Sequence, residues 1–144
     1  MYTEQMSQGL SIAATPIHPQ TLNNASANTG GIDMSKFRRA LFVADIGSVT
    51  GGGSLTAKLQ ESADDSTYTD VSGGAATAIT ASSKVATLEM RAGQLSSGKK
   101  YVRCRLTEGG SQNVVCACIA LGGEAIAKPA SAQDNAVVTQ RLVI

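Results

Sequence analysis

His18 is the only histidine in this sequence and the only imidazole with which it could carry out acid–base or nucleophilic chemistry. A catalytic histidine must be held rigidly beside its nucleophile by a third group. His18 instead precedes Pro19 in a segment without helical or strand periodicity. We interpret it as a surface or interface histidine, and we expect that the protein is not an enzyme.

Three cysteines, Cys104, Cys116 and Cys118, are the candidate metal ligands. Cys116 and Cys118 are two residues apart, so on a strand they point to the same face. A structural zinc site takes four ligands, and this set supplies three. If the turn at 108–111 closes a hairpin, Cys104 lies opposite Cys116. We predict three free thiols that fill a tight core, with no metal and no other cofactor.

Four carboxylates, at Glu61, Asp64, Asp65 and Asp70, have the composition of a calcium loop but not its spacing. An EF-hand fixes its oxygen ligands at set positions along twelve residues, and DDSTYTD does not match them. Aspartates at a hairpin tip usually accept hydrogen bonds from nearby backbone N–H groups. Asp64 and Asp65 are therefore predicted to form a turn.

The composition argues against two classes of partner. The formal net charge is +1 over 144 residues, whereas proteins that bind nucleic acid carry a basic excess or a basic stripe. No apolar run approaches the roughly 20 residues that span a bilayer, and the first residues lack a secretion signal. We expect neither a nucleic-acid nor a membrane partner, in a protein made in a host cytoplasm.

Strand patterns recur from residue 35 onward and predict an all-β fold. In 54–62, Leu55, Ala57 and Leu59 alternate with polar residues. In 37–46 both faces are apolar, which is typical of a strand that is covered on both sides. About eight strands predict an antiparallel β-sandwich or jelly roll over residues 34–144. The predicted strands are 37–46, 54–62, 67–71, 75–81, 83–92, 100–107, 112–121 and 136–144.

Residues 1–33 have a different composition and are predicted to form an extended arm. Pro16 and Pro19 break any helix, yet the segment is too apolar for a solvated linker. A disordered tail is the alternative interpretation. The arm and an apolar last strand, which could pair with another chain, supply the candidate partner contacts. These residues are Leu10, Ile12, Ile17, Leu22, Ile32, Leu142 and Ile144.

Three stretches resemble small virion proteins of tailed bacteriophages. AKLQESADDSTYTDVSGG (57–74) is similar to a pattern in which a strand of the type LQESxD precedes DxxxYxDV, or the same with Trp. SKFRRALFVADIGSVTGGGSLTAKL (35–59) and KKYVRCRLTEGGSQNVVCACIALGG (99–123) resemble the same proteins. The resemblance covers roughly residues 33–124, so it does not extend to the predicted arm.

The resemblance implies a capsid decoration, or cement, protein, which binds the outer capsid surface and joins neighbouring capsid subunits. Its partners would be the major capsid protein and further copies of itself, with a trimer favoured by capsid symmetry. The expected location is the virion. Two alternatives stay open: a tail-tube or head–tail connector subunit, and a receptor- or glycan-binding virion module. The few aromatic residues count against glycan binding.

Overall fold

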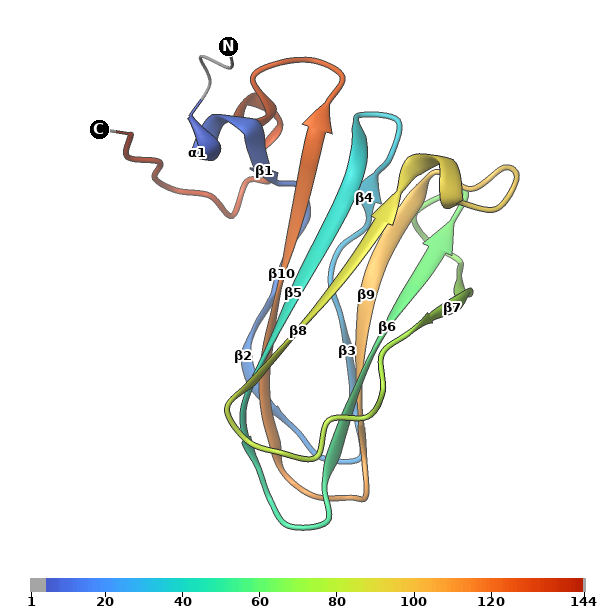
Figure 1. Cartoon of the computed structure of the whole chain (residues 1–144), viewed down its shortest axis with the longest axis vertical. Helices are drawn as coiled ribbons and strands as arrows, with labels where there is room; N and C mark the ends of the chain where they lie inside the picture. The colour runs from blue at the N-terminus through green and yellow to red at the C-terminus, as the bar shows by residue number, and fades with distance from the viewer. Residues whose placement is uncertain (1–4, 144) are drawn as a thin grey trace.

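The computed structural model describes residues 5–143 and consists mainly of β-strands (Figure 1). A short helix, α1 (Met6–Gly9), comes first, and two 3-10 helices, η1 (Ala92–Gln94) and η2 (Ala130–Gln133), follow later in the chain. Within residues 5–143 no helix is long and apolar enough to cross a membrane. The ten strands are β1 (Leu10–Ile12), β2 (Ile17–Leu22), β3 (Ser26–Asn28), β4 (Ile32–Asp33), β5 (Phe37–Val49), β6 (Ser54–Ser62), β7 (Tyr68–Ala75), β8 (Lys84–Arg91), β9 (Tyr101–Gly109) and β10 (Val114–Ala125).

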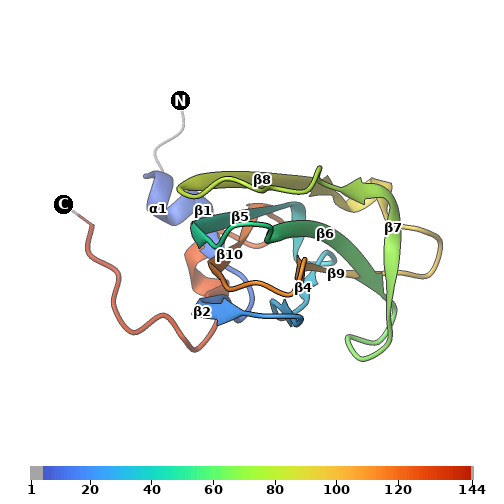
Figure 2. The same cartoon turned by 90° about the horizontal axis from the view of Figure 1, so that it is seen from below.

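The strands form two antiparallel sheets that pack together (Figure 2). Sheet A has the order β1-β10-β5-β8, with β2 also paired to β10. Sheet B has the order β3-β9-β6-β7, with β4 also paired to β9. The pairs are nested along the chain: β6 with β7, β5 with β8, β3 with β9 and β2 with β10. This nested pairing across two sheets is a jelly roll, so the predicted all-β sandwich is confirmed.

The core between the sheets is built from small and medium-sized side chains. Burial alternates residue by residue along β9, where Val102, Cys104 and Leu106 face inward as predicted. Gly122 on β10 is required by this packing, because an added Cβ would lie 2.6 Å from the ring of Phe37. Both residues lie in sheet A, so the Phe37 ring packs over the space that Gly122 leaves on the adjacent strand.

Strand β5 is apolar on both faces, but the chain covers only one of them. Ala40, Phe42 and Ala44 are fully buried between the sheets. Leu41 and Val43 point to the opposite face and are only half buried. The expected cover on both sides is therefore incomplete in the single chain.

The predicted N-terminal arm is instead part of both sheets. Residues 10–33 form β1 to β4, which pair with β10 and β9, so a division at residue 33 does not hold. Ile17, Leu22 and Ile32 are buried in the core, and Leu10 and Ile12 are half buried. The prediction of a free arm is wrong because widely spaced apolar residues indicate that a segment is buried. They do not indicate whether it is buried against its own chain or against a partner. Here β9 and β10 supply the surface.

Three other predictions about strands are corrected. Of the predicted strand 75–81, only Ala75 lies in a strand, at the end of β7, although an isolated bridge joins Ile79 to Leu55. The described part of the last predicted strand, 136–143, is also irregular. The turn after β9 leads from sheet B to β10 in sheet A, so it does not close a hairpin. The predicted pairing of 54–62 with the strand that follows is confirmed by β6 and β7.

Candidate interaction surfaces

The outer face of sheet A, here named face A, carries an apolar patch. Face A comprises the residues of β10, β5 and β8 that alternate with the buried ones. Val85 is 61% exposed and Ile119 is 47% exposed. Together with the half-buried Leu41 and Val43 between them, they make face A a candidate contact surface. From one end to the other, the paired rows of face A are Gly123–Arg39–Arg91, Leu121–Leu41–Glu89, Ile119–Val43–Thr87 and Ala117–Asp45–Val85.

A groove of about 500 Å³ lies beside this patch. Residues 16–19, at the start of β2, form one wall, and Val43, Val85 and Ile119 contribute to the rest. His18 lines the groove and is exposed, and its side chain makes no hydrogen bond to another residue of the described chain. The structure thus places His18 at a surface, as predicted. That the protein is not an enzyme stays a prediction.

Charged side chains lie at both ends of face A. At one end Arg39 forms ion pairs with Glu89 at 2.9 Å and Glu124 at 2.8 Å. Hydrogen bonds to Glu89 and Glu124 raise the pKa of the Arg39 guanidinium. Arg91 lies beside Arg39, and Asp45 lies at the opposite end of face A. Within residues 5–143, neither Arg91 nor Asp45 forms an ion pair.

The outer face of sheet B, here named face B, is polar and bonded within the chain. The guanidinium of Arg103 lies 3.9 Å from the ring centroid of Tyr68. Its Nε and Nη2 atoms donate to Gln60 Oε1 at 3.0 and 2.8 Å. Gln60 Nε2 donates to Asp70 Oδ1 at 2.7 Å, and Lys58 Nζ lies 2.6 Å from Asp70 Oδ2. The bonds from Lys58 and Gln60 lower the pKa of Asp70.

The acidic turn between β6 and β7 is held by Asp64. Its Oδ1 atom accepts from the backbone N–H of Thr67 at 2.9 Å and of Ser66 at 3.0 Å, and from the Ser62 hydroxyl at 2.9 Å. These hydrogen bonds, that of Thr67 foremost, hold the pKa of Asp64 well below its ordinary 3.8. The predicted turn role of Asp64 is therefore confirmed.

Asp65 and Tyr68 fasten this turn to the rest of face B. Asp65 has a left-handed backbone, with φ 59°, and accepts a hydrogen bond from the Tyr68 hydroxyl. Burial and this bond raise the pKa of Tyr68. Both side chains pack so closely on Gly31 that a Cβ there would collide with them. No cluster of three or more potential metal ligands occurs within residues 5–143.

The three cysteines are free and buried, as predicted. Because β9 and β10 lie in different sheets, Cys104 meets Cys118 across the core and not Cys116 within a sheet. The hydrogen bond with Cys118, together with burial, raises the pKa of Cys104. Burial raises the pKa of Cys116 to about 11. Thiols with raised pKa values are poor nucleophiles, which fits a packing role.

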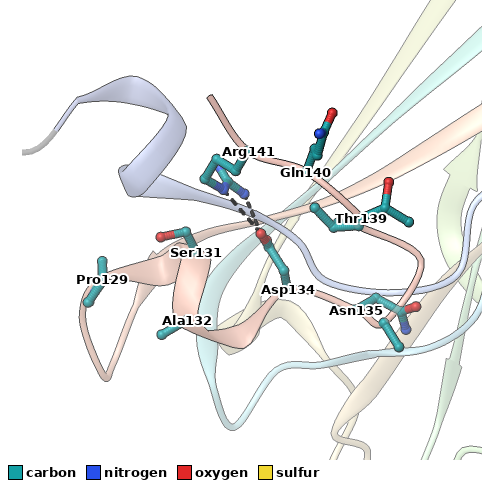
Figure 3. Close-up of a pocket in the computed structure, with 10 residues that line it drawn as sticks. Pro129, Ser131, Ala132, Asp134, Asn135, Thr139, Gln140 and Arg141 are labelled. Carbon is teal, nitrogen blue, oxygen red and sulfur yellow. Dashed lines mark hydrogen bonds and ion pairs between the residues drawn. The ribbon is translucent and has the colours of Figure 1, made fainter. Parts of the chain in front are cut away.

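Residues 136–143, here named the tail, extend away from one end of the sandwich, on the side of α1 and β1 (Figure 1). Arg141 holds the tail to the chain, because its Nη2 atom lies 2.5 Å from Asp134 Oδ2 (Figure 3). Its Nη1 atom donates to the Ser7 carbonyl. Leu142 follows directly and is 82% exposed. Its role as a partner contact stays a prediction, and Ile144 lies outside the described residues.

Sequence reasoning missed face A, although a signal for it exists. Residues 37–46 are apolar at both odd and even positions, and so is the stretch VVCACIAL at 114–121. One set fills the core, and the second set must lie on an outer surface or at a contact. The hydrogen bonds between Gln60 and Arg103 have no comparable signal in the sequence. They join β6 to β9, and the local residue pattern does not show that these two strands pair.

No model of a known protein family and no curated protein sequence matches this chain. Among solved structures, one similar chain comes from Bacillus endospore appendages, a novel family of disulfide-linked pili. The two chains are 14% identical, and the match covers 85% of this chain and 97% of the other at a TM-score of 0.42. A likeness at this level carries no conclusion about the present chain.

Proposed function

We propose that this chain is a structural virion protein of a tailed phage, which binds the outer surface of the capsid and cements neighbouring capsid subunits. The observation that carries the proposal is the nested strand order of the two sheets. Jelly rolls of this kind build viral capsid proteins and lectins. Architecture alone does not determine function. The resemblance of residues 57–74 to phage virion proteins favours the virion role over the lectin role.

The residues that carry the resemblance make the module rigid. Gln60, Asp64, Tyr68 and Asp70 all belong to the β6–β7 hairpin, and each makes a hydrogen bond that holds the hairpin or joins it to β9. A cement protein catalyses no reaction, so rigidity and surface complementarity are what it needs. The residues that carry the resemblance are therefore residues that hold the β6–β7 hairpin in place.

In this proposal the tail contacts the capsid, a role that the sequence predicts for the N-terminal segment. Residues 10–33 are paired within sheets A and B, so they do not form a free arm that could extend to another protein. The tail, in contrast, presents Leu142 and Val143 to solvent just beyond the Arg141 anchor. An extended apolar segment can add itself as a strand to a neighbour's sheet, gaining backbone hydrogen bonds with little folded mass.

Removal of residues 136–144 should leave the sandwich folded but weaken its attachment to capsids by about tenfold or more, because the exposed apolar contacts are lost. The measurement is co-sedimentation of the purified chain with phage heads that lack it. Leu142→Asp should weaken binding in the same direction. Thr139→Asp, which adds the same charge at another exposed tail position, is the matched control and should have a smaller effect.

The outcomes separate the parts of the proposal. Equal binding by the truncated and full chains would contradict the role of the tail while leaving the cement role in place. A full chain that does not bind capsids at any concentration would contradict the cement role itself. Binding to isolated tails instead of heads would favour a tail-tube or connector subunit.

A further inference from the structure

Face A has a polarity that runs along strand β5. Its outward residues are, in order, Arg39, Leu41, Val43 and Asp45, so a cation and an anion bracket two apolar side chains. The neighbouring strands extend this arrangement: Leu121 and Ile119 lie beside the apolar pair on one side. On the other side, Arg91 lies beside Arg39, and Val85 lies beside Asp45. The apolar centre is only partly buried, with Ile119 exposed, although its pattern is that of a covered strand.

We infer that face A is covered by face A of a second copy of this chain, so that two sandwiches pair back to back about a two-fold axis. A two-fold interface uses the same patch on both subunits, which must then be complementary to itself. Sheets that pack face to face lie about 10 Å apart with their side chains interdigitated. The symmetry axis must lie in the plane between the sheets, and its direction decides which rows meet.

An axis that runs across the strands makes face A self-complementary. This axis reverses the strand direction of the second copy, so the row of Arg39 and Arg91 meets the row of Asp45 in each half of the interface. The two central rows exchange as well, which places Leu41 over Val43 and Leu121 over Ile119. All four apolar side chains at the centre then contact apolar side chains of the second copy.

An axis that runs along the strands gives the opposite result. It brings the cationic row of one copy over the cationic row of the other, and Asp45 over Asp45. Like charges that face each other at short distance are destabilising. Electrostatics therefore selects the arrangement in which Asp45 of one copy faces Arg39 of the other, with Arg91 on the neighbouring strand of the same cationic row.

The outer corners of face A do not obstruct this packing. Gly123 and Ala117 occupy the end rows on β10, where large side chains would hold the two sheets apart. Arg39 is already turned toward Glu89 and Glu124, so it lies along its own sheet. The inference does not depend on capsid binding: a chain that never meets a capsid would still pair.

Sedimentation equilibrium of the purified full chain tests the pairing. We expect a mass of twice the 14.7 kDa of one chain at micromolar concentration. Ile119→Asp places a charge in the apolar centre and should raise the dissociation constant by about a hundredfold, because a buried unpaired charge is costly. Ile126→Asp is the matched control, since Ile126 is 63% exposed and lies outside face A. It should leave the pair intact.

Charge exchange tests the direction of the axis. Asp45→Arg alone and Arg91→Asp alone should each weaken the pair, and the double variant should restore at least part of the loss. Circular dichroism establishes that each variant is folded, and Val85→Lys replaces Ile119→Asp if the latter is not. A monomer at all concentrations, a mass of three copies, or a pair unaffected by both Ile119→Asp and Val85→Lys would overturn the inference. Weakening by both charge variants without any restoration would overturn the proposed axis.

Discussion

Face A and face B are the outer surfaces of the same sandwich, but they are organised in opposite ways. On face B the polar groups are bonded to one another in a chain from Arg103 through Gln60 and Asp70 to Lys58. On face A the centre is apolar and only partly buried, and Asp45 and Arg91 form no ion pair within residues 5–143. Face B is thus completed by its own chain, whereas face A has the character of a surface that another molecule completes.

The difference indicates where stability and association reside. Residues on face B should contribute to the folding of one chain, and residues on face A should contribute to contacts between chains. Substitutions at matched positions can separate these two contributions, because unfolding of dilute protein reports on the first and association reports on the second.

The largest change in the free energy of unfolding is expected for a residue on the inner face of sheet A. Phe42 and Val43 are neighbours on β5, and Phe42 is fully buried whereas Val43 lies on face A. Phe42→Ala should lower the free energy of unfolding by about 3–5 kcal/mol, since it leaves a cavity in the core. Val43→Ala should cost less than about 1 kcal/mol in dilute protein. Urea unfolding measures both, and similar losses would contradict the assignment of inner and outer faces.

A smaller effect is expected on face B. Arg103→Ala removes the contact with Tyr68 and leaves the buried Gln60 Oε1 without its two donors. We expect a loss of about 1–3 kcal/mol in the free energy of unfolding, the usual cost of an unpaired buried polar atom. Ile119→Ala on face A should change the unfolding of dilute protein by less than about 0.5 kcal/mol. A larger loss for Ile119→Ala than for Arg103→Ala would break the comparison.

The smallest effect is expected in the loss of stability at low pH. The pKa values of Asp64 and Asp70 are both lower in the folded chain than the ordinary 3.8. Below about pH 5 the unfolded state therefore binds more protons, so the stability that these carboxylates contribute is present above that pH and is lost as the pH falls. The urea midpoint should be lower at pH 3 than at pH 7. The double variant Asp64→Asn, Asp70→Asn should lose less between the two pH values, and an equal loss would contradict this account.

The local pattern of the sequence predicted the strands and their buried faces well where polar and apolar residues alternate. Leu55, Ala57 and Leu59 on β6 and Val102, Cys104 and Leu106 on β9 point inward for this reason. The turn role of Asp64 was also predictable, because its partners lie within three residues. Periodicity and turn chemistry are local properties, and a single sequence records them directly.

Pairing between distant strands could not be predicted from the same pattern. The burial of Ile17 and Leu22 depends on β10, roughly a hundred residues later, and nothing near β2 specifies that partner. The turn after β9 has the glycines of a hairpin but joins two sheets, which only the remaining strands decide. The tail has the alternation of a strand, yet no described edge pairs with it. Face A could have been predicted from β5, because this strand is apolar on both faces and its own chain covers only one of them.

A cryo-electron microscopy map of the assembled phage particle, detailed enough to trace this chain, tests the central claim most directly. We expect sandwiches on the outer surface of the capsid, with residues 136–143 against a capsid subunit and face A against a second copy. Density for this chain in the tail, or its absence from the particle, would contradict the cement role. A capsid-bound chain whose tail points into solvent would contradict the proposed way of holding on.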